Sequence, residues 1–258
     1  MLRLISIGHD DRVPELEEFR AVSQTMPQSR VGSIQALEWI PRISDEERKT
    51  FEAQTTDLLG TDFAITSRNR DEALAPAARG DYYYPVTFVE PTAGNEAAIG
   101  FDLGSNPERR TSLELARDSG RATATAPIRL VQEQTADQFG FLVFAPLYRG
   151  DPPPASVDER RERLVGFMLG VFRTVDIVER AARGLAPSSA IAIGIVDESA
   201  SASEQLVYVR GAGTSGDAEL RSLATLDIAG RPWLITRVAT AAYGSAHSSL
   251  TWAILLAG

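Results

Sequence analysis

The sequence predicts an α+β protein in which two small antiparallel-sheet domains follow an N-terminal helical segment. Apolar residues recur at helical spacing up to Gly60, and beyond it they gather in short β-rich runs separated by proline and glycine. Strands arranged around one crossing helix then occur twice, on either side of the proline-rich linker at 149–160. With 258 residues, of which 43% are apolar, the chain can fill cores of this kind.

Two helices are expected before Gly60. The first spans 14–26, where one apolar stripe recurs at helical spacing. The stripe consists of Leu16, Phe19, Val22 and Met26. The second helix begins at Ser44, because a serine followed three residues later by Glu47 is a capping box, and Gly60 ends it.

The first sheet domain is expected to combine several strands with one helix. Its strands are expected at 62–66, 82–90, 97–103, 122–133 and 139–148. Its helix spans 105–120, with Ser105 or Asn106 as the N-cap and Gly120 as the terminator.

The second sheet domain is expected beyond the linker, after a charged and solvated stretch at 158–163. Its elements are a strand at 164–173, a helix at 174–184, and strands at 190–198, 204–210, 224–230 and 231–240. The final segment, 248–258, is apolar but shorter than the roughly 20 residues of a membrane span. Taken alone, this segment favours a terminal strand.

Composition excludes several kinds of function. A net charge of −9 argues against a nucleic-acid partner, which usually requires a basic face. The absence of cysteine excludes disulfides, thiolate metal sites and a thiol nucleophile. Only His9 and His247 could supply imidazole, and they lie near opposite ends of the chain. The sequence therefore predicts neither a metal site nor a cofactor.

Catalytic and nucleotide-binding motifs are weak. GAGTSG at 211–216 matches a dinucleotide-binding pattern, but the residues after it are mostly strand-like, which leaves no room for the βαβ unit that this pattern serves. A hairpin-like loop explains it better. The serine-hydrolase pattern G-x-S-x-G is absent. An enzyme is therefore the third choice, after two kinds of non-catalytic module.

One acidic residue stands out. Asp102 lies between Phe101 and Leu103, directly ahead of the helix expected at 105–120. Two interpretations are open at this point. The carboxylate either satisfies its own backbone around Ser105 and Asn106 or faces a bound molecule.

Four segments together resemble the CHASE domain family. They are IQALEWIPRISDEERKTFE, YYYPVTFVEPTAGNEAAIGFDLGSNPERR, LARDSGRATATAPIRLVQE and GFLVFAPLY, which follow the family's order and spacing over about residues 34–150. That family is the extracytoplasmic sensory module of receptor histidine kinases, diguanylate cyclases and related membrane signalling enzymes. The resemblance implies an N-terminal stalk helix followed by two tandem PAS-like subdomains.

The resemblance also implies a division of the chain. The expected parts are a stalk segment at 1–58, a membrane-distal ligand-binding subdomain at 59–150, a membrane-proximal subdomain at 151–249, and the start of a transmembrane helix at 250–258. CHASE modules sit between two transmembrane helices, so this expectation replaces the terminal strand. It further implies a homodimer joined along its stalk helices, on the periplasmic side of a bacterial inner membrane, without catalytic residues of its own.

Candidate ligand contacts follow from the same resemblance. In the related plant cytokinin receptors, an aspartate at the position of Asp102 hydrogen-bonds an adenine ring, so Asp102 is the first candidate. The other expected contacts are Tyr84, Thr123, Thr125, Arg129 and Phe144. Phe144 replaces a smaller, hydroxyl-bearing residue expected in the plant pattern. This difference favours a smaller or differently shaped ligand, such as another small ring compound.

Two functions of different classes stay open on the sequence. The first is a sensor that binds a small molecule in the distal subdomain and transmits the signal across the membrane. The second is an interaction or dimerisation module that senses a protein partner, with its pocket filled by side chains. An aromatic plug would leave such a module without response to small metabolites.

Overall fold

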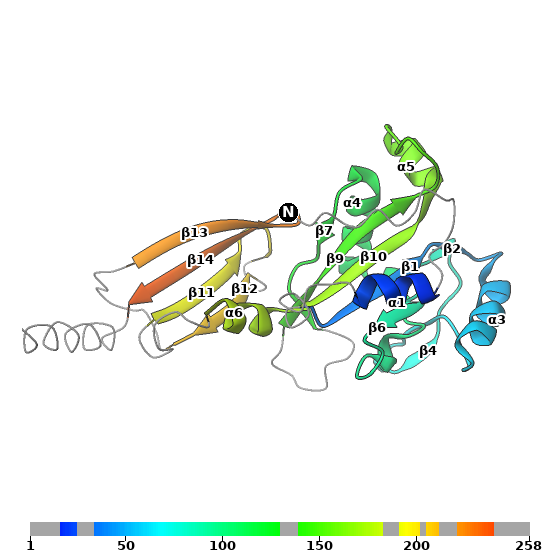
Figure 1. Ribbon diagram of the computed structural model, residues 1–258, viewed down its shortest axis with the longest axis horizontal. Helices are drawn as coiled ribbons and strands as arrows, with labels where there is room; N and C mark the ends of the chain where they lie inside the picture. The colour runs from blue at the N-terminus through cyan, green and yellow to red at the C-terminus, as the bar shows by residue number, and fades with distance from the viewer. Residues whose placement is uncertain are drawn as a thin grey trace, which may run out of the picture. The chain divides into compact units, whose positions relative to one another are not determined.

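The computed structural model describes residues 16–24, 34–129, 139–182, 191–201, 205–211 and 221–239. It confirms the mixture of helices with antiparallel sheets (Figure 1). The chain forms two compact units, 1–173 and 174–258.

A six-stranded antiparallel sheet forms the frame of the first unit. Its strands run in the order β6-β1-β10-β9-β7, with β8 also paired to β9. Their bounds are β1 Ala36–Pro41, β6 Phe88–Glu90, β7 Thr123–Ala124, β8 Ile128–Arg129, β9 Phe139–Tyr148 and β10 Leu164–Arg173. The two longest strands, β9 and β10, are apolar on both faces, as expected for strands covered on both sides.

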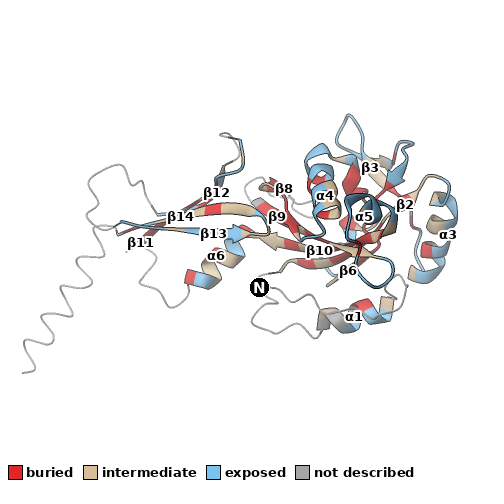
Figure 2. Cartoon of the chain, turned by 90° about the horizontal axis from the view of Figure 1, so that it is seen from above, coloured by how far each residue is buried: buried red, intermediate tan, exposed pale blue. Residues whose placement is uncertain are grey.

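Helices cover the two faces of this sheet. On one face, α4 packs Leu113 and Ala116 into the core that contains Phe144 and Leu169. On the other face, Phe19 of α1 packs with strand residues of a second cluster (Figure 2). The helices and 3-10 turns of the unit are α1 Leu16–Gln24, α3 Arg48–Leu59, η1 Glu96–Ala98, η2 Leu103–Ser105, α4 Pro107–Ser119 and α5 Val157–Arg163.

Two small strand pairs complete the first unit. They are β2 Ile43–Ser44 with β5 Tyr82–Tyr83, and β3 Thr66–Arg68 with β4 Leu74–Pro76. The strand expected at 97–103 is wrong, because that segment forms η1, η2 and isolated bridges at Phe101 and Asp102. Gly100 has φ +83°, and a Cβ on it would lie 2.4 Å from the Ala64 carbonyl oxygen, so only glycine allows the two segments to approach this closely.

Most local end signals agree with the sequence, but the start of α3 does not. The Ser44 backbone N–H donates to Glu47 Oε2 at 3.0 Å and the Glu47 N–H to Ser44 Oγ at 3.3 Å, so the predicted pair forms. It lies ahead of the helix, however, because Ser44 ends β2 and α3 begins at Arg48 with Glu47 as its N-cap. Gly60 ends α3 in the left-handed conformation at φ +68°. At the start of α4, Asn106 Oδ1 accepts from the Arg109 N–H at 3.0 Å, so Asn106 is the cap.

The stretch after the linker differs from expectation in two ways. The charged residues 158–163 belong to α5, whose N-terminus carries a capping box made by Ser156 and Glu159. The following strand, β10, was assigned to the second subdomain, yet it pairs with β1 and β9 inside the first unit. Pairing with a distant strand leaves no signal in local spacing, so the sequence did not reveal it.

In its described residues, the second unit consists of a four-stranded antiparallel sheet and one helix. Its strand order is β12-β11-β14-β13, and α6 Thr174–Ala182 contacts β12. The strands are β11 Ile191–Asp197, β12 Leu206–Arg210, β13 Arg221–Ile228 and β14 Arg231–Ala239. Ala229 and Gly230, at φ +49° and +89°, make the tight turn between β13 and β14.

Of the expected stalk and membrane segments, the structure describes a short helix and the residues from 34 onward, but not the C-terminal end. α1 spans Leu16–Gln24, and its Phe19 is 1% exposed against the chain's own sheet, so this side chain is already used within one copy. The side chain of Val22 and all of Met26 lie outside the described residues, as does 250–258. Within the described part of the chain, no helix is long and apolar enough to cross a membrane.

Candidate functional site

The sheet face covered by α4 brings distant residues into one row. Across β1, β10, β9 and β7, the register aligns Glu38 with Leu169, Leu169 with Phe144, and Phe144 with Thr123. Directly opposed residues of neighbouring strands project to the same face. Two of the predicted contacts, Thr123 and Phe144, therefore share a face with Glu38.

Aromatic rings fill the space above this row. Phe144 is 0% exposed, and its ring centroid lies 6.0 Å from that of Phe167 in an edge-to-face arrangement. Tyr84 packs on Phe167 at 5.9 Å, and burial raises the pKa of the Tyr84 phenol. Tyr84 and Phe144 thus meet through Phe167, in the interior of the unit.

Asp102 lies at the edge of this aromatic cluster and is 5% exposed. Its Oδ1 accepts hydrogen bonds from the backbone N–H of Tyr84 at 2.8 Å and of Gly104 at 3.0 Å. Among the described residues, none donates a hydrogen bond to its Oδ2. Burial raises the pKa of the Asp102 carboxyl, although the two N–H groups act in the opposite direction.

Gly104 makes this approach possible. A Cβ at that position would lie 2.7 Å from Tyr84 Cδ2 and 3.2 Å from Asp102 Oδ1, closer than a side chain can sit. One oxygen of the Asp102 carboxylate therefore stabilises the local backbone by accepting from the N–H groups of Tyr84 and Gly104. Ser105 is served instead by the Asp102 carbonyl oxygen, to which its Oγ donates at 2.6 Å.

The hydroxyls of the two predicted threonines bond backbone groups of the chain itself. Thr125 is 0% exposed, and its Oγ1 accepts from the Leu142 N–H at 3.1 Å, so its hydroxyl extends the sheet ladder. Thr123 Oγ1 donates to the Arg121 carbonyl at 3.3 Å. Arg129 belongs to β8, but its side chain lies outside the described part. The structure therefore brings together Asp102, Tyr84, Thr123 and Phe144.

Sequence reasoning missed two buried charges on the same face. Glu38 is 2% exposed and Arg109 is 7% exposed, and the Arg109 guanidinium lies 5.3 Å from the Phe101 ring centroid. Burial lowers the pKa of Arg109 to about 10, while the negative charge of Glu38 acts to raise it. Helical spacing could have flagged Arg109, because it precedes the core residues Leu113 and Ala116 by four and seven positions.

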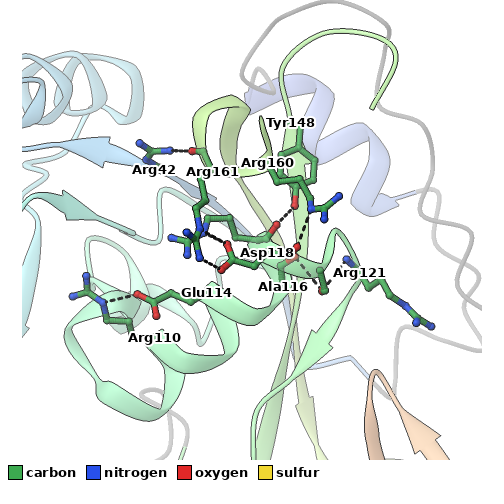
Figure 3. Close-up of polar contacts among 11 residues, drawn as sticks. Arg42, Arg110, Glu114, Ala116, Asp118, Arg121, Tyr148, Arg160 and Arg161 are labelled. Carbon is green, nitrogen blue, oxygen red and sulfur yellow. Dashed lines mark hydrogen bonds and ion pairs between the residues drawn. The ribbon is translucent and has the colours of Figure 1, made fainter. Parts of the chain in front are cut away.

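A polar cluster holds the C-terminal end of α4 against α5 (Figure 3). Asp118 Oδ2 accepts from Arg161 Nη2 at 2.6 Å, and its Oδ1 accepts from Arg117 Nε at 2.6 Å. Arg160 Nε donates to the Asp118 carbonyl at 2.8 Å, and the Tyr148 hydroxyl donates to the Arg117 carbonyl. These arginines hold the pKa of Asp118 well below its usual range. The cluster positions α4, which carries Arg109.

Metal ligands do not gather at this face. Within the described ranges, no group of three or more histidine, aspartate or glutamate side chains could hold a metal ion.

Comparison with known proteins identifies the family. The family model of the CHASE domain matches residues 14–208. The chain belongs to the CHASE domain family. CHASE domains are extracellular sensory domains of receptors, and the relatives of this one are histidine kinases.

Three of these relatives share low but extended similarity with this CHASE domain. The hybrid signal transduction histidine kinase A of Dictyostelium discoideum is 22% identical over 239 residues, covering 82% of this chain and 11% of the relative. Histidine kinase 3 of Arabidopsis thaliana is 26% identical, covering 75% and 19%. Probable histidine kinase 6 of Oryza sativa subsp. japonica is 29% identical, covering 75% and 18%. The chain thus spans less than a fifth of each relative's length.

Proposed function

We propose that this CHASE domain binds a small molecule on the α4-covered face of its first unit, as the sensor of a membrane-bound signalling receptor. The observation that carries this proposal is the carboxylate of Asp102. The residue is 5% exposed, and its Oδ2 accepts no hydrogen bond from the described residues, yet it is not one of the fully buried atoms that lack a partner, so it stays accessible to a bound molecule. A buried carboxylate is costly unless hydrogen-bonded. An N–H group on a ligand would supply the missing bond.

The polar residues buried near this face support the same proposal. Buried polar side chains are not needed to build an apolar core, because each one must find a hydrogen-bond partner to offset the cost of its desolvation. Those buried near this face are Glu38, Asp102, Arg109, Ser112, Thr123 and Thr125. The ligand that fits is a small ring compound with an N–H donor, adenine-like or smaller, because Phe144 fills part of the interior next to Phe167.

The proposed receptor places this domain on the extracytoplasmic side, in the periplasm of a bacterium, between membrane helices. Its output would come from a histidine kinase or diguanylate cyclase region, with no catalysis by this chain. In a homodimer, the ligand would favour one of two arrangements of the copies. A ligand shifts such an equilibrium only by its different affinities for the two states.

A second candidate function is an interaction module without a small-molecule ligand. The packing of Tyr84 and Phe144 around Phe167 favours it, since these rings occupy the interior where a ligand would sit. In that case a protein partner or dimerisation would supply the signal.

A thermal-shift screen with small nitrogen heterocycles, adenine among them, separates the two candidates. A ligand at 100 times its dissociation constant adds about 2.7 kcal/mol of stability. For any compound that stabilises the chain, Asp102→Asn is expected to weaken binding roughly ten- to 150-fold, because a charge-assisted hydrogen bond is lost. Asp71→Asn, on an exposed loop, is the matched control and should change nothing. Unchanged affinity in Asp102→Asn would remove the proposed site, and a screen without any stabilising compound would favour the interaction module.

A further inference from the structure

The sheet of the second unit exposes a long edge at β13. Among the described residues, β13 pairs on one side only, with β14 (Figure 1). All eight of its residues pair with β14 without a shift in register, and the strand contains neither lysine nor proline. Exposed edge strands are commonly protected from other chains by lysine, proline, a bulge or a very short length. β13 has none of these protections and is open to a further strand.

The opposite edge of the same sheet is formed differently. β12 has five residues, and its pairing with β11 shifts in register between Ile195 and Val196. Such an irregularity interrupts the ladder and discourages a further strand. β13 is straight in its pairing, and its Leu223 and Leu226 are 56% and 49% exposed. The edge at β13 is therefore the better docking surface of the two.

Every second residue of β13 directs its backbone groups to this free edge. Ala229 and Gly230 both have positive φ, which makes a two-residue turn closed by a hydrogen-bonded pair of Ile228 and Arg231. Bonded and non-bonded pairs alternate along an antiparallel ladder, so the even-numbered residues of β13 bond β14. The odd-numbered residues therefore turn their N–H and C=O groups away from β14. They are Arg221, Leu223, Thr225 and Asp227.

The sequence of β13 is complementary to itself about Ala224. Two copies related by a twofold axis present the same edge to each other and pair antiparallel. With Ala224 opposite its own copy, Arg221 lies opposite the partner's Asp227, and Leu223 lies opposite the partner's Thr225. All four odd-numbered residues then find hydrogen-bonding partners. A shift by one step in either direction leaves Arg221 or Asp227 without an opposite charge.

The two charges are placed to interact in this register. Arg221 and Asp227 are both exposed, and they lie near the two ends of the strand. Asp227 Oδ1 accepts from the Gly230 N–H at 3.1 Å, so the other carboxylate oxygen can accept from the partner's Arg221. Opposite charges that face each other across two strands stabilise the pairing, and like charges destabilise it. By symmetry, this ion pair occurs at both ends of the interface.

We propose that a second copy of this chain docks on β13, so that the two sheets join into one continuous sheet across a twofold axis at Ala224. The occupant is a second copy because the charges of this edge complement the same strand running antiparallel beside it. One strand per copy makes an interface below the standard size of about 1,600 Å², so we expect a weak, concentration-dependent dimer. The surface belongs to the second unit and does not depend on ligand binding in the first.

Disulfide mapping tests the pairing, because the chain has no cysteine of its own. Ala224→Cys places one thiol of each copy at the axis, in a non-hydrogen-bonded pair whose Cα atoms lie about 4.5 Å apart, a distance that a disulfide spans. Under mild oxidation, this variant is expected to form linked dimers roughly ten times faster than Leu115→Cys, because pairing raises the effective concentration of the thiols. Leu115, on α4, is 57% exposed and reports random collisions. Equal rates in the two variants would overturn the proposal.

A pair of further cysteine variants tests the register. Ser222 lies opposite the partner's Leu226 in the proposed pairing. Ser222→Cys and Leu226→Cys should each link poorly alone, since about four residues of strand, roughly 13 Å, separate each thiol from its own copy. Mixed together, with one variant carrying a size tag, they should link to each other. A mixture that links no better than the single variants would contradict this register.

Charge reversal tests the ion pairs without any cross-link. Arg221→Asp sets like charges opposite each other at both ends of the interface and is expected to raise the dissociation constant of the dimer roughly tenfold. The double variant Arg221→Asp/Asp227→Arg restores opposite charges and should recover the dimer, which a merely misfolded chain would not. Sedimentation equilibrium of the full chain measures both. A dimer that is indifferent to Arg221→Asp, or a chain that is monomeric at every concentration, would overturn the proposal.

Discussion

At the scale of single residues, the titration of Asp102 tests its surroundings without any ligand. Burial raises its pKa above the ordinary 3.8, so ionisation is less favourable in the folded chain than in the unfolded one. The stability that this group contributes is therefore fully present below pH 3.8 and is lost as the pH rises through its raised pKa. Asn at this position keeps an oxygen for the N–H groups of Tyr84 and Gly104 but cannot ionise.

We therefore expect Asp102→Asn to be at least as stable as the natural chain at neutral pH. Its advantage should shrink as the pH falls below 3.8, where the natural carboxyl is also neutral. Urea unfolding of both proteins, at neutral pH and below pH 3.8, measures the difference in their free energies of unfolding. A variant that is less stable by the same amount at both would show that the charge of Asp102 is not penalised by burial.

Some residues of the candidate site could be predicted from the sequence, and others could not because they meet only in the folded chain. Asp102, Tyr84, Thr123 and Phe144 were found by resemblance, and the sheet register brings them to one region. The pairing of Glu38 with the charge of Arg109 was missed. These residues lie far apart in the chain, and they come near each other only because β1 is an inner strand of the sheet and α4 covers its face.

At the scale of elements, the cluster around Asp118 joins α4 to α5. Its carboxylate pairs with Arg117 and Arg161, whose side chains are 18% and 52% exposed, so solvent screens part of the attraction. The lowered pKa means that the stabilisation is present above the ordinary pKa of 3.8 and is lost as the pH falls through the depressed value.

Asp118→Asn is expected to lower the free energy of unfolding by about 1 kcal/mol at neutral pH, near the upper end for partly exposed pairs. The difference from the natural chain should narrow in strong acid. Glu114→Gln is the control, since its pair with Arg110 on α4 is about half exposed and contributes less. Equal losses in the two variants, measured by urea unfolding, would mean that the cluster does not clamp α4.

Elements with a strong local pattern could be predicted, and elements defined by distant partners could not. The apolar runs of β9 and β10 and the capped pattern of α4 gave bounds close to those observed. The apolar run at 97–103 misled, because a buried stretch can turn in short 3-10 segments instead of pairing over its length. β1 was not predicted, although it is an inner strand of the sheet, paired with β6 on one side and β10 on the other.

At the scale of the whole molecule, the first unit contains all six strands of its sheet only if it extends to Arg173. We expect a fragment of residues 1–173 to fold on its own and to show a cooperative unfolding transition. A fragment of residues 1–150 lacks β10, which holds β1 and β9 together, and should not fold. Circular dichroism and urea unfolding of the two fragments test this, and a folded 1–150 fragment would place the division at the linker.

The pairing of β1 with β10 also has a consequence for folding during synthesis on the ribosome. Residues 36–41 emerge early, but their main partner, residues 166–171, is made much later. At a synthesis rate of about 5–20 residues per second, the intervening ~130 residues take roughly 7 to 26 s. During that interval one edge of β1 is exposed, with Trp39 and Ile40 beside it, and such an edge is a template for wrong pairing. Newly made chains of this CHASE domain are therefore expected to depend on chaperones until β10 has been synthesised and has paired with β1.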